Sequence, residues 1–280
     1  MKYFHRAEKT IVVSRGDVAF LGRVVRGDAN KKTFSGLDPW RKLFSTGLPI
    51  LTYHHVGARP AGVQWRGLWV SPRLFARQLR ELHEDGFRST SLDGALPSRG
   101  NTERRCILSF DDGYVSVFEN AIGPLARFGF RGIQFLVAGH IGGVNSWDVA
   151  AGELPTRLMD ESQVQSWLKA GHEIGSHTVS HPRLTRIPRA RQREEIRASK
   201  RMLEDRFAVE VRHLCYPYGD FDDWVVEFAA DAGYSTACTH LESGVNTAET
   251  HRLRLRRIEC RYPTRNFRTL WGRLKAALRF

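Results

Sequence analysis

The sequence predicts an α/β fold in which a mainly parallel sheet curves into a distorted (β/α) barrel of seven or eight strands. Three observations lead to this expectation. From residue 48 onward, short apolar runs alternate with helical patterns, which is the order that βαβ units produce. The runs are too numerous for a short open sheet. Polar motifs follow several runs directly, and barrels of this class collect their chemistry at the carboxyl ends of the strands.

The expected strands are short apolar runs separated by turn-forming residues. The run CILSF at 106–110 is a strong example. The full set is 48–53, 87–92, 106–110, 133–137, 173–177, 211–216, 234–239 and 253–260.

The expected helices show apolar residues at helical spacing and tend to end at glycine. In the first of them, Phe75, Leu79 and Leu82 share one face, and Gly86 follows. In the second, Gly123-Pro124 predicts an interruption, because proline lacks the N–H that a helix needs. The set is 72–85, 115–128, 161–170, 189–207 and 221–232.

Composition excludes several classes of protein. The chain has 280 residues, of which 41% are hydrophobic and 26% charged, and this argues against disordered, collagen-like and coiled-coil proteins. No apolar run approaches the roughly 20 residues that span a bilayer. We see no secretory signal at the start, and we expect the four widely spaced cysteines to be reduced (Cys106, Cys215, Cys238 and Cys260). A cytoplasmic location follows as an expectation.

The net charge of +13 is concentrated at the two ends of the chain. Residues 1–46 carry ten Lys or Arg against four Asp or Glu, and residues 251–280 carry ten against one. Such ends favour anionic partners or serve as a solubilising surface. We expect a basic extension at 1–46, a barrel at 47–262 and a basic amphipathic helix at 263–280. That helix either docks on its own domain or lies on an anionic membrane, which would make the protein peripheral there.

Two adjacent carboxylates, Asp111 and Asp112, follow the strand at 106–110 and precede Gly113. Successive side chains alternate along a strand, so one carboxylate can bind a metal while the other faces substrate. The competing interpretation is an ordinary turn with a helix N-cap. The residues alone do not say which aspartate takes which role.

Two histidines, His177 and His181, follow another strand at spacing i, i+4. Neutral imidazole suits Zn²⁺ and similar divalent metals. Together with one aspartate they give three ligands and leave room for water, whose pKa a metal lowers. The other aspartate is then a natural general base. The turn Tyr216–Gly219 (YPYG) can aim backbone N–H groups at a developing oxyanion, although a plain Pro-Gly turn is equally compatible.

These motifs resemble the polysaccharide deacetylase family, also called the NodB-homology group or carbohydrate esterase family 4. The resemblance rests on FDDG at 110–113, SHTVSHP at 176–182 and YPYG at 216–219, in that order and approximate spacing. TYHHVG at 52–57 and NSWD at 145–148 are similar too, and the likeness covers about residues 48–260. It implies a NodB-type distorted barrel, a divalent metal and removal of an acyl group from an amino sugar.

The resemblance also assigns roles. It implies that Asp111 is the catalytic base, that Asp112, His177 and His181 bind the metal, and that the N–H of Tyr218 stabilises the oxyanion. Substrate contacts are expected from residues near the ends of the strands and in the long loop after the strand at 133–137, namely His54, His55, Trp147 and Pro217. Packing roles are the alternative for the histidines and for Trp147.

Two departures from the family pattern are visible. Cys215 stands where many members place an arginine that orients the base, and Arg256 or Arg257 is a candidate substitute. The late strand RLRLRRIEC lacks the Leu-x-His motif whose histidine is the general acid. His251 is the candidate acid, while His251 and His240 as plain surface residues are the alternative.

We therefore expect a metal-dependent hydrolase that removes N-acetyl groups from an amino-sugar polysaccharide or glycan precursor. Water activated by the metal, with an Asp general base, would carry the reaction. Zn²⁺ is the default ion, and Co²⁺, Ni²⁺ or Mn²⁺ are alternatives. A lipid-linked sugar as substrate, with loss of a formyl or acetyl group, and a non-catalytic glycan-binding barrel are the other hypotheses. No zinc-finger or RNA-binding signature accompanies the basic charge, so we expect no nucleic-acid partner.

Overall fold

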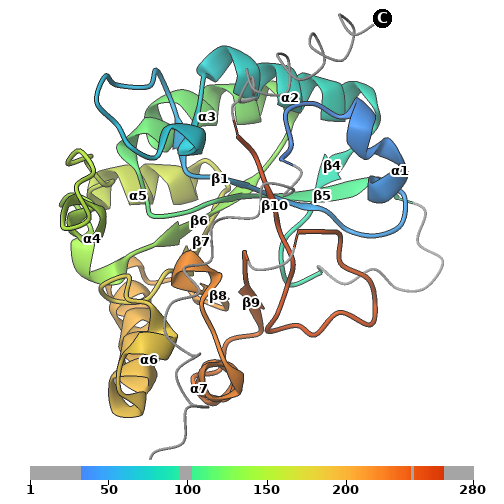
Figure 1. The fold of residues 1–280 in the computed structure, drawn as a ribbon. Coiled ribbons are helices and arrows are strands. Elements are labelled where there is room, and N and C mark those ends of the chain that lie inside the picture. Colours follow the sequence, from blue (N-terminus) through green and yellow to red (C-terminus); the bar gives the residue numbers. More distant parts are fainter. Residues whose placement is uncertain (1–32, 95–102, 241–242, 262–280) are drawn as a thin grey trace, which may run out of the picture. The chain divides into compact units, whose positions relative to one another are not determined.

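The computed structural model describes residues 33–94, 103–240 and 243–261, as Figure 1 shows. By its internal contacts the chain divides into residues 1–31 and 32–280. The first unit lies outside the described ranges, and every described element belongs to the second.

One eight-stranded sheet forms the centre of this unit, and every strand pair in it is parallel. Its order is β10-β1-β5-β6-β7-β8-β9, and β4 also pairs with β5. A separate pair, β2 with β3, follows β1. The strands are β1 Ile50–Tyr53, β2 His55–Val56, β3 Trp69–Val70, β4 Arg88–Ser89, β5 Arg105–Phe110, β6 Gly132–Leu136, β7 Glu173–Ser176, β8 His213–Cys215, β9 Thr236–Cys238 and β10 Ile258–Glu259.

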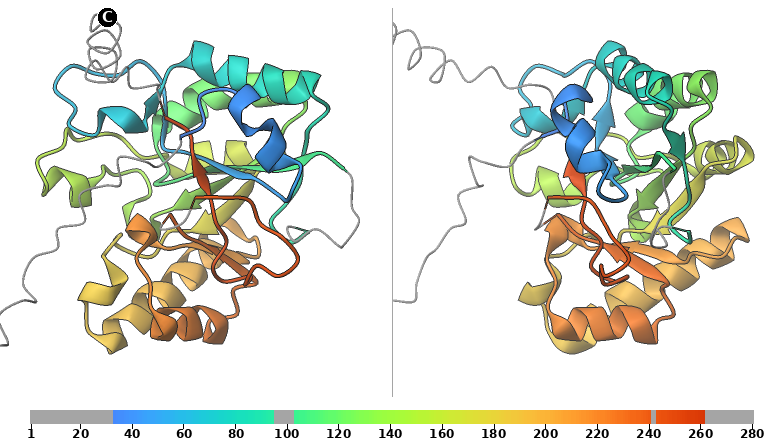
Figure 2. Two further views of the ribbon diagram at one scale, coloured as in Figure 1. Left: turned by 45° about the vertical axis from the view of Figure 1, so that its right-hand side comes forward. Right: turned by 90° about the vertical axis from the view of Figure 1, so that its right-hand side faces the viewer.

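The last segment of the sheet connects its two edges. Leu255 forms a parallel bridge with Cys238 of β9, and the N–H of Thr239 donates to Leu255 O at 2.9 Å. A few residues later, β10 pairs with β1 at the opposite edge. The sheet is therefore a distorted barrel, closed irregularly between β9 and β10, with helices around its outside (Figure 2). The predicted fold class is confirmed.

The helices occupy the connections between strands. They are α1 Arg41–Phe44, α2 Pro72–Glu84, α3 Val115–Phe128, α4 Ser146–Val149, α5 Glu161–Lys169, α6 Arg189–Phe207 and α7 Asp223–Asp231. Short 3₁₀ helices are η1 Asp38–Trp40, η2 Arg66–Leu68, η3 Ala138–His140, η4 Leu184–Arg186 and η5 Pro217–Gly219.

Local sequence explains where several helices begin and end. The Ser71 hydroxyl accepts the N–H of Leu74 and starts α2, and Asp160 with Gln163 forms a capping box at the start of α5. Gly129 ends α3 in the left-handed conformation, at φ 70°.

The predicted interruption of α3 is wrong, because the helix runs unbroken through Pro124. Its inner face carries Val117, Ala121 and Leu125, all fully buried. This packing outweighs the hydrogen bond that Pro124 cannot donate.

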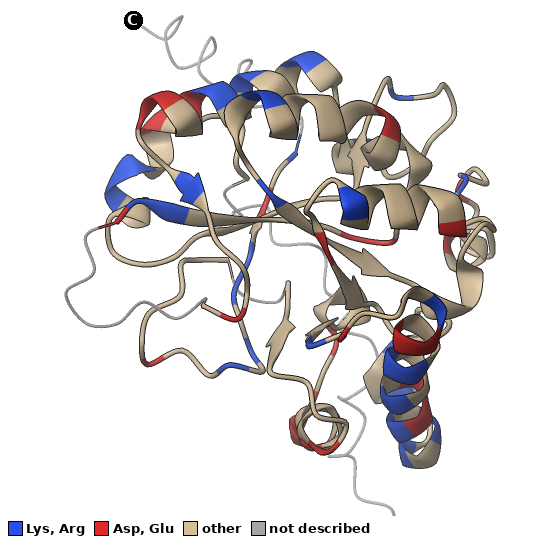
Figure 3. Ribbon diagram, turned by 180° about the vertical axis from the view of Figure 1, so that it is seen from behind, with Lys and Arg blue, Asp and Glu red and all other residues tan. Residues whose placement is uncertain are grey.

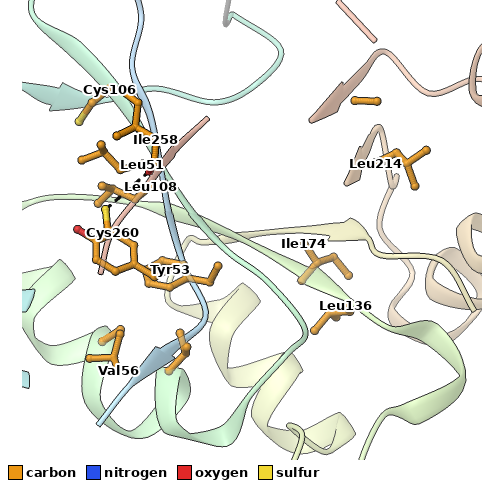
Figure 4. Close-up of a cluster of buried hydrophobic side chains, with 14 of the residues drawn as sticks. Leu51, Tyr53, Val56, Cys106, Leu108, Leu136, Ile174, Leu214, Ile258 and Cys260 are labelled. Carbon is orange, nitrogen blue, oxygen red and sulfur yellow. Dashed lines mark hydrogen bonds between the residues drawn. The ribbon is translucent and has the colours of Figure 1, made fainter. Parts of the chain in front are cut away.

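Apolar side chains from neighbouring strands meet in one large core cluster, part of which Figure 4 shows. Residues before the predicted barrel boundary join it: Phe34, Leu37, Trp40 and Phe44 are buried there. The N–H of Phe34 also donates to Glu259 O at 2.8 Å. The packed unit thus includes residues that the sequence prediction placed in the basic extension. The rest of that extension, residues 1–32, and the predicted helix at 263–280 lie outside the described residues.

Charged residues of both signs alternate along the exposed side of α6, as Figure 3 shows from behind. In the described ranges, no helix combines the length and the apolar character that crossing a bilayer requires. All four cysteines are buried and unpaired.

Candidate metal centre and active site

The two aspartates leave β5 through a tight turn. The N–H of Asp111 still donates to Tyr53 O of β1, at 2.9 Å. Asp112 then adopts a left-handed backbone conformation, at φ 71°, and Gly113 follows at φ 85°. A positive φ is uncommon for a non-glycine residue such as Asp112. It turns the neighbouring carboxylates of Asp111 and Asp112 in different directions. A side chain at position 113 would meet Leu136 at 3.0 Å.

The histidine loop follows β7 and is fixed by a glutamate of α6. Glu195 accepts the N–H groups of Val179 and Ser180, each at 2.9 Å, and the hydroxyl of Ser180 at 2.7 Å. The N–H of His181 donates to the Thr178 hydroxyl at 3.1 Å. These bonds hold the loop between the two imidazoles in one conformation.

Asp112, His177 and His181 converge on one point. Nε2 of His177 lies 3.4 Å from Asp112 Oδ1, and Nε2 of His181 lies 3.3 Å from it. All three residues are buried. Within the described ranges Asp112 Oδ1 accepts no hydrogen bond, although a buried carboxylate oxygen normally has a partner. The Nδ1–H of His177 donates to Cys215 O at 2.7 Å, which leaves the Nε2 lone pair free for a ligand. The donor set fits a divalent metal.

Two other groups of residues bring ligand atoms equally close: His54, Asp111 and His240, and Asp111, His177 and Cys215. Both include Asp111, whose two oxygens already face a guanidinium cation. The Arg257 group donates from Nη1 to Oδ1 at 2.8 Å and from Nη2 to Oδ2 at 2.9 Å. A cation bound there would be repelled by Arg257, so the Asp112 group is the better metal site.

Arg257 and His240 define the surroundings of Asp111. The side chains of Arg257 and Asp111 are both fully buried. His240 Nε2 lies 2.9 Å from Asp111 Oδ2 and also contacts Arg257. Burial alone would raise the pKa of Asp111, but Arg257 and His240 hold it well below its usual range. Asp111 is therefore an ionised carboxylate at neutral pH.

The structure distinguishes the two candidate arginines. Arg257 also donates to Cys215 Sγ at 2.9 Å, so it reaches the place where the family pattern puts an arginine at position 215. Arg256 is exposed, and its backbone N–H donates to Asn246. Arg257 is thus the arginine that contacts Asp111.

The two neighbouring histidines after β1 have different surroundings. His54 Nε2 lies 3.8 Å from Asp111 Oδ2, and its ring stacks on His240 with centroids 5.8 Å apart. His55 is buried between Trp69 and Tyr114, at centroid distances of 3.9 and 3.7 Å. Burial lowers its pKa to about 3. These contacts place His54 beside Asp111, and they favour a packing role for His55 in place of the expected substrate contact.

The structure does not bring His251 to the site. It is exposed, and its Nδ1 accepts the N–H of Leu253 at 3.2 Å. His240 lies against Asp111 instead, although the sequence pattern indicated no more than a surface residue there. Its position directly after the strand at 234–239, like the other motifs, was the available signal. Burial, followed by the charge of Arg257, lowers the pKa of His240 to about 4.

Aromatic residues surround His181. The rings of Trp147 and Tyr218 lie 4.7 and 4.6 Å from the His181 ring. Pro217 is buried, and Tyr218 has a left-handed backbone at φ 59°. The turn is closed by Gly219 N–H and Asp220 N–H, which donate to Tyr216 O and Pro217 O. Trp147, Pro217 and Tyr218 therefore lie beside the metal-ligand group.

Asp148 is a site residue to which no sequence pattern assigned a role. Its Oδ2 accepts the Tyr114 hydroxyl at 3.2 Å. Burial and the nearby charge of Asp112 raise the pKa of Asp148 to about 6. It is a further carboxyl near Asp112, besides Asp111.

Comparison with known proteins agrees with this geometry. A family model described as polysaccharide deacetylase matches residues 98–237. YxkH of Bacillus subtilis strain 168, whose name assigns it to the polysaccharide deacetylases, is 24% identical over 196 residues. The match covers 69% of this chain and 64% of YxkH, so the chain spans less than two thirds of that relative.

Solved structures show the same fold. The Streptococcus pyogenes deacetylase PplD, in complex with acetate, superposes with a TM-score of 0.64 at 22% identity, over 81% of this chain and 97% of PplD. IcaB from Ammonifex degensii gives a TM-score of 0.63 at 22% identity, over 82% and 96%. The segment that the family model matches, residues 98–237, contains both aspartates and both histidines, and it amounts to half of the chain. The chain belongs to the polysaccharide deacetylase family.

Proposed function

We propose that the protein is a metal-dependent hydrolase that removes N-acetyl groups from an amino-sugar polysaccharide or from a glycan precursor. One observation carries the proposal: a buried Asp112–His177–His181 group lies beside the ionised Asp111 in a chain of the polysaccharide deacetylase family. The solved complex of the neighbour PplD contains acetate, the product of such a reaction.

Asp112, His177 and His181 would hold the ion. Imidazole nitrogens and a carboxylate oxygen suit Zn²⁺, with Co²⁺, Ni²⁺ or Mn²⁺ as alternatives. When bound, such an ion acts as a Lewis acid that polarises the amide carbonyl and lowers the pKa of water. The His177–Cys215 hydrogen bond and the Glu195 contacts with the loop orient the ligands.

Asp111 would accept the proton of the attacking water. Arg257 fixes the plane of its carboxylate through two parallel hydrogen bonds. Oδ2 also faces His240, so Oδ1 is the oxygen that keeps a lone pair for the proton. Protonated Asp111 would then return that proton to the leaving amine. His54 and His240 lie against Asp111 Oδ2, so they, and not His251, are the imidazoles placed to assist this proton transfer.

The N–H of Tyr218 would donate to the oxyanion that develops on the acyl carbon. The left-handed conformation of Tyr218 and the packing of its ring on His181 support this role. Preorganised donors of this kind contribute on the order of 10²–10³-fold in rate.

A lipid-linked sugar as substrate, and peripheral contact with an anionic membrane from the cytoplasmic side, depend on basic segments outside the described residues. They stay predictions.

The test is acetate release by purified protein from a panel of N-acetylated glycans, with and without chelator. We expect release that chelator abolishes and added Zn²⁺ restores. Release that is unaffected by chelator would contradict metal dependence. Metal binding without release from any glycan would favour a non-catalytic glycan-binding barrel.

A further inference from the structure

Two segments run side by side outward from the metal-ligand group. One is the end of the histidine loop with the start of α6, residues 183–189, and the other comes after β8, residues 218–224. Thr185 joins them, because its N–H and its hydroxyl both donate to the Asp220 carboxylate, at 2.9 and 2.8 Å. Their continuations, α6 and α7, are in contact with each other (Figure 1).

The two segments form two arginine–aromatic pairs, in which the first segment supplies both arginines and the second supplies both aromatic rings. The guanidinium of Arg183 lies 4.0 Å from the centre of the Tyr218 ring, and that of Arg189 lies 3.9 Å from the Trp224 ring. Both arginines are exposed, and the residues Tyr218 and Trp224 are 36% and 43% exposed. We call these four residues the arginine–aromatic strip. Stacking on an aromatic face holds a guanidinium flat and leaves its edge N–H groups available to a ligand.

Among the described residues, the two arginines of the strip are not engaged in ion pairs with the carboxylates nearby. Within the described ranges, neither Arg183 nor Arg189 has an ion-pair partner. The acidic side chains of the second segment have other partners. Asp220 binds Thr185, Asp222 caps α7 through Val225 N–H, and Asp223 pairs with Arg254.

The strip begins at the metal-ligand group. The Tyr218 ring that carries Arg183 packs 4.6 Å from His181. Arg183 is itself two residues after His181 in the chain. A sugar bound with its acyl group at Asp111 and Asp112 would therefore place its neighbouring residue, or a substituent, close to Arg183.

We infer that the substrate is an anionic glycan, and that Arg183 and Arg189 bind an oxyanion, carboxylate or phosphate, adjacent to the N-acyl sugar. Guanidinium groups pair with both anions through two parallel hydrogen bonds. The inference rests on the proposed deacetylase function, whose substrate class it narrows.

The experiment measures binding in the Asp111→Asn background, where no turnover is expected. Three probes are compared: chitotetraose, which is neutral, a tetrasaccharide of alternating glucuronic acid and N-acetylglucosamine, and N-acetylglucosamine 1-phosphate. Each is titrated against Arg183→Gln, Arg189→Gln and the control Arg201→Gln. Arg201 is an exposed arginine of α6 that pairs with Glu194.

The expected result is that one of the anionic probes binds at least about tenfold more tightly than chitotetraose. Each strip variant should bind that anionic probe roughly three- to tenfold more weakly, and its affinity should depend less on salt concentration. Arg201→Gln should bind the probe with unchanged affinity. The carboxylate and phosphate probes identify which anion is preferred.

Equal affinity for neutral and anionic probes, no binding of any probe, or unchanged affinity in both strip variants would overturn the inference. So would arginine-dependent binding to vesicles containing phosphatidylglycerol that no oligosaccharide competes away, since that would indicate a membrane contact. Failure of the proposed function is a separate result: anionic probes bind through the strip, yet wild-type protein with metal releases no acetate from them.

Discussion

At the scale of single residues, the informative contact is the one between Arg257 and Asp111. Arg257 lies in the segment before β10 and is far from Asp111 in the sequence. Both of its terminal nitrogens nevertheless donate to the Asp111 carboxylate. It also donates to Cys215 Sγ, at the position where the family pattern places an arginine. An arginine from the segment before β10 therefore contacts both Asp111 and the residue that stands where the resemblance places an arginine.

This contact predicts a graded loss of activity. Arg257→Gln should lower kcat by about 10²-fold or more, because the carboxylate loses its orientation and its charge partner. Arg257→Lys should lose less, since it keeps the charge without the two parallel bonds. Breaking a buried pair costs about 3–5 kcal/mol, so unfolding is measured alongside kcat and bound metal. A folded Arg257→Gln protein that retains metal and wild-type kcat would exclude the positioning role.

At the scale of elements, the repeating order of strands and helices was predictable because apolar runs and glycine stops are local signals. α6 matches its predicted limits, Arg189–Phe207. The sequence named Arg257 only as an alternative to Arg256, and it favoured His251 over His240. Which of them reaches Asp111 depends on how residues 252–255 pair with β9 across the barrel closure. The placement of Phe34 was not predictable, because no local pattern indicates its strand-like bridge to Cys260.

Close packing within the sheet leads to a prediction for Gly175 of β7. A Cβ at this position would lie 2.6 Å from the Phe135 ring and 2.9 Å from His213 O, a backbone atom of β8. Gly175→Ala should therefore destabilise the fold by about 1–3 kcal/mol. Gly244→Ala is the matched control, since its added Cβ would meet the Arg256 side chain at 3.6 Å, an ordinary contact, and it should change stability by less than about 0.5 kcal/mol. Urea unfolding of both variants checks this, and equal stabilities would be contrary to the described packing.

At the scale of the whole molecule, buried imidazoles link stability to pH. Burial lowers the pKa values of His172 and His213 from 6.5 to about 4. His172 Nδ1 accepts the N–H of Gly132 at 3.3 Å, and His213 faces Asp93 and Glu173 at 3.7 and 3.9 Å. Because the unfolded chain binds these protons more readily, the stabilising effect is complete above pH 6.5. It is lost as pH falls from 6.5 to 4.

The expected loss is about 1–2 kcal/mol for His172 between pH 7 and 4.5. The free energy of unfolding should therefore fall less steeply with acid in His172→Gln than in wild type, although the variant is less stable at pH 7. Urea titrations at several pH values measure both slopes. Parallel slopes would show that His172 is not held neutral by the fold.

The central claim is that Asp112, His177 and His181 hold one divalent ion while Asp111 acts as the base. The most direct test reconstitutes wild type, Asp111→Asn, Asp112→Asn and His181→Ala with Zn²⁺, and measures bound metal per chain together with acetate release. We predict one ion in wild type and in Asp111→Asn, little or none in the other two, and acetate release by wild type alone. Full metal content and full activity in His181→Ala, or activity in Asp111→Asn, would contradict this claim.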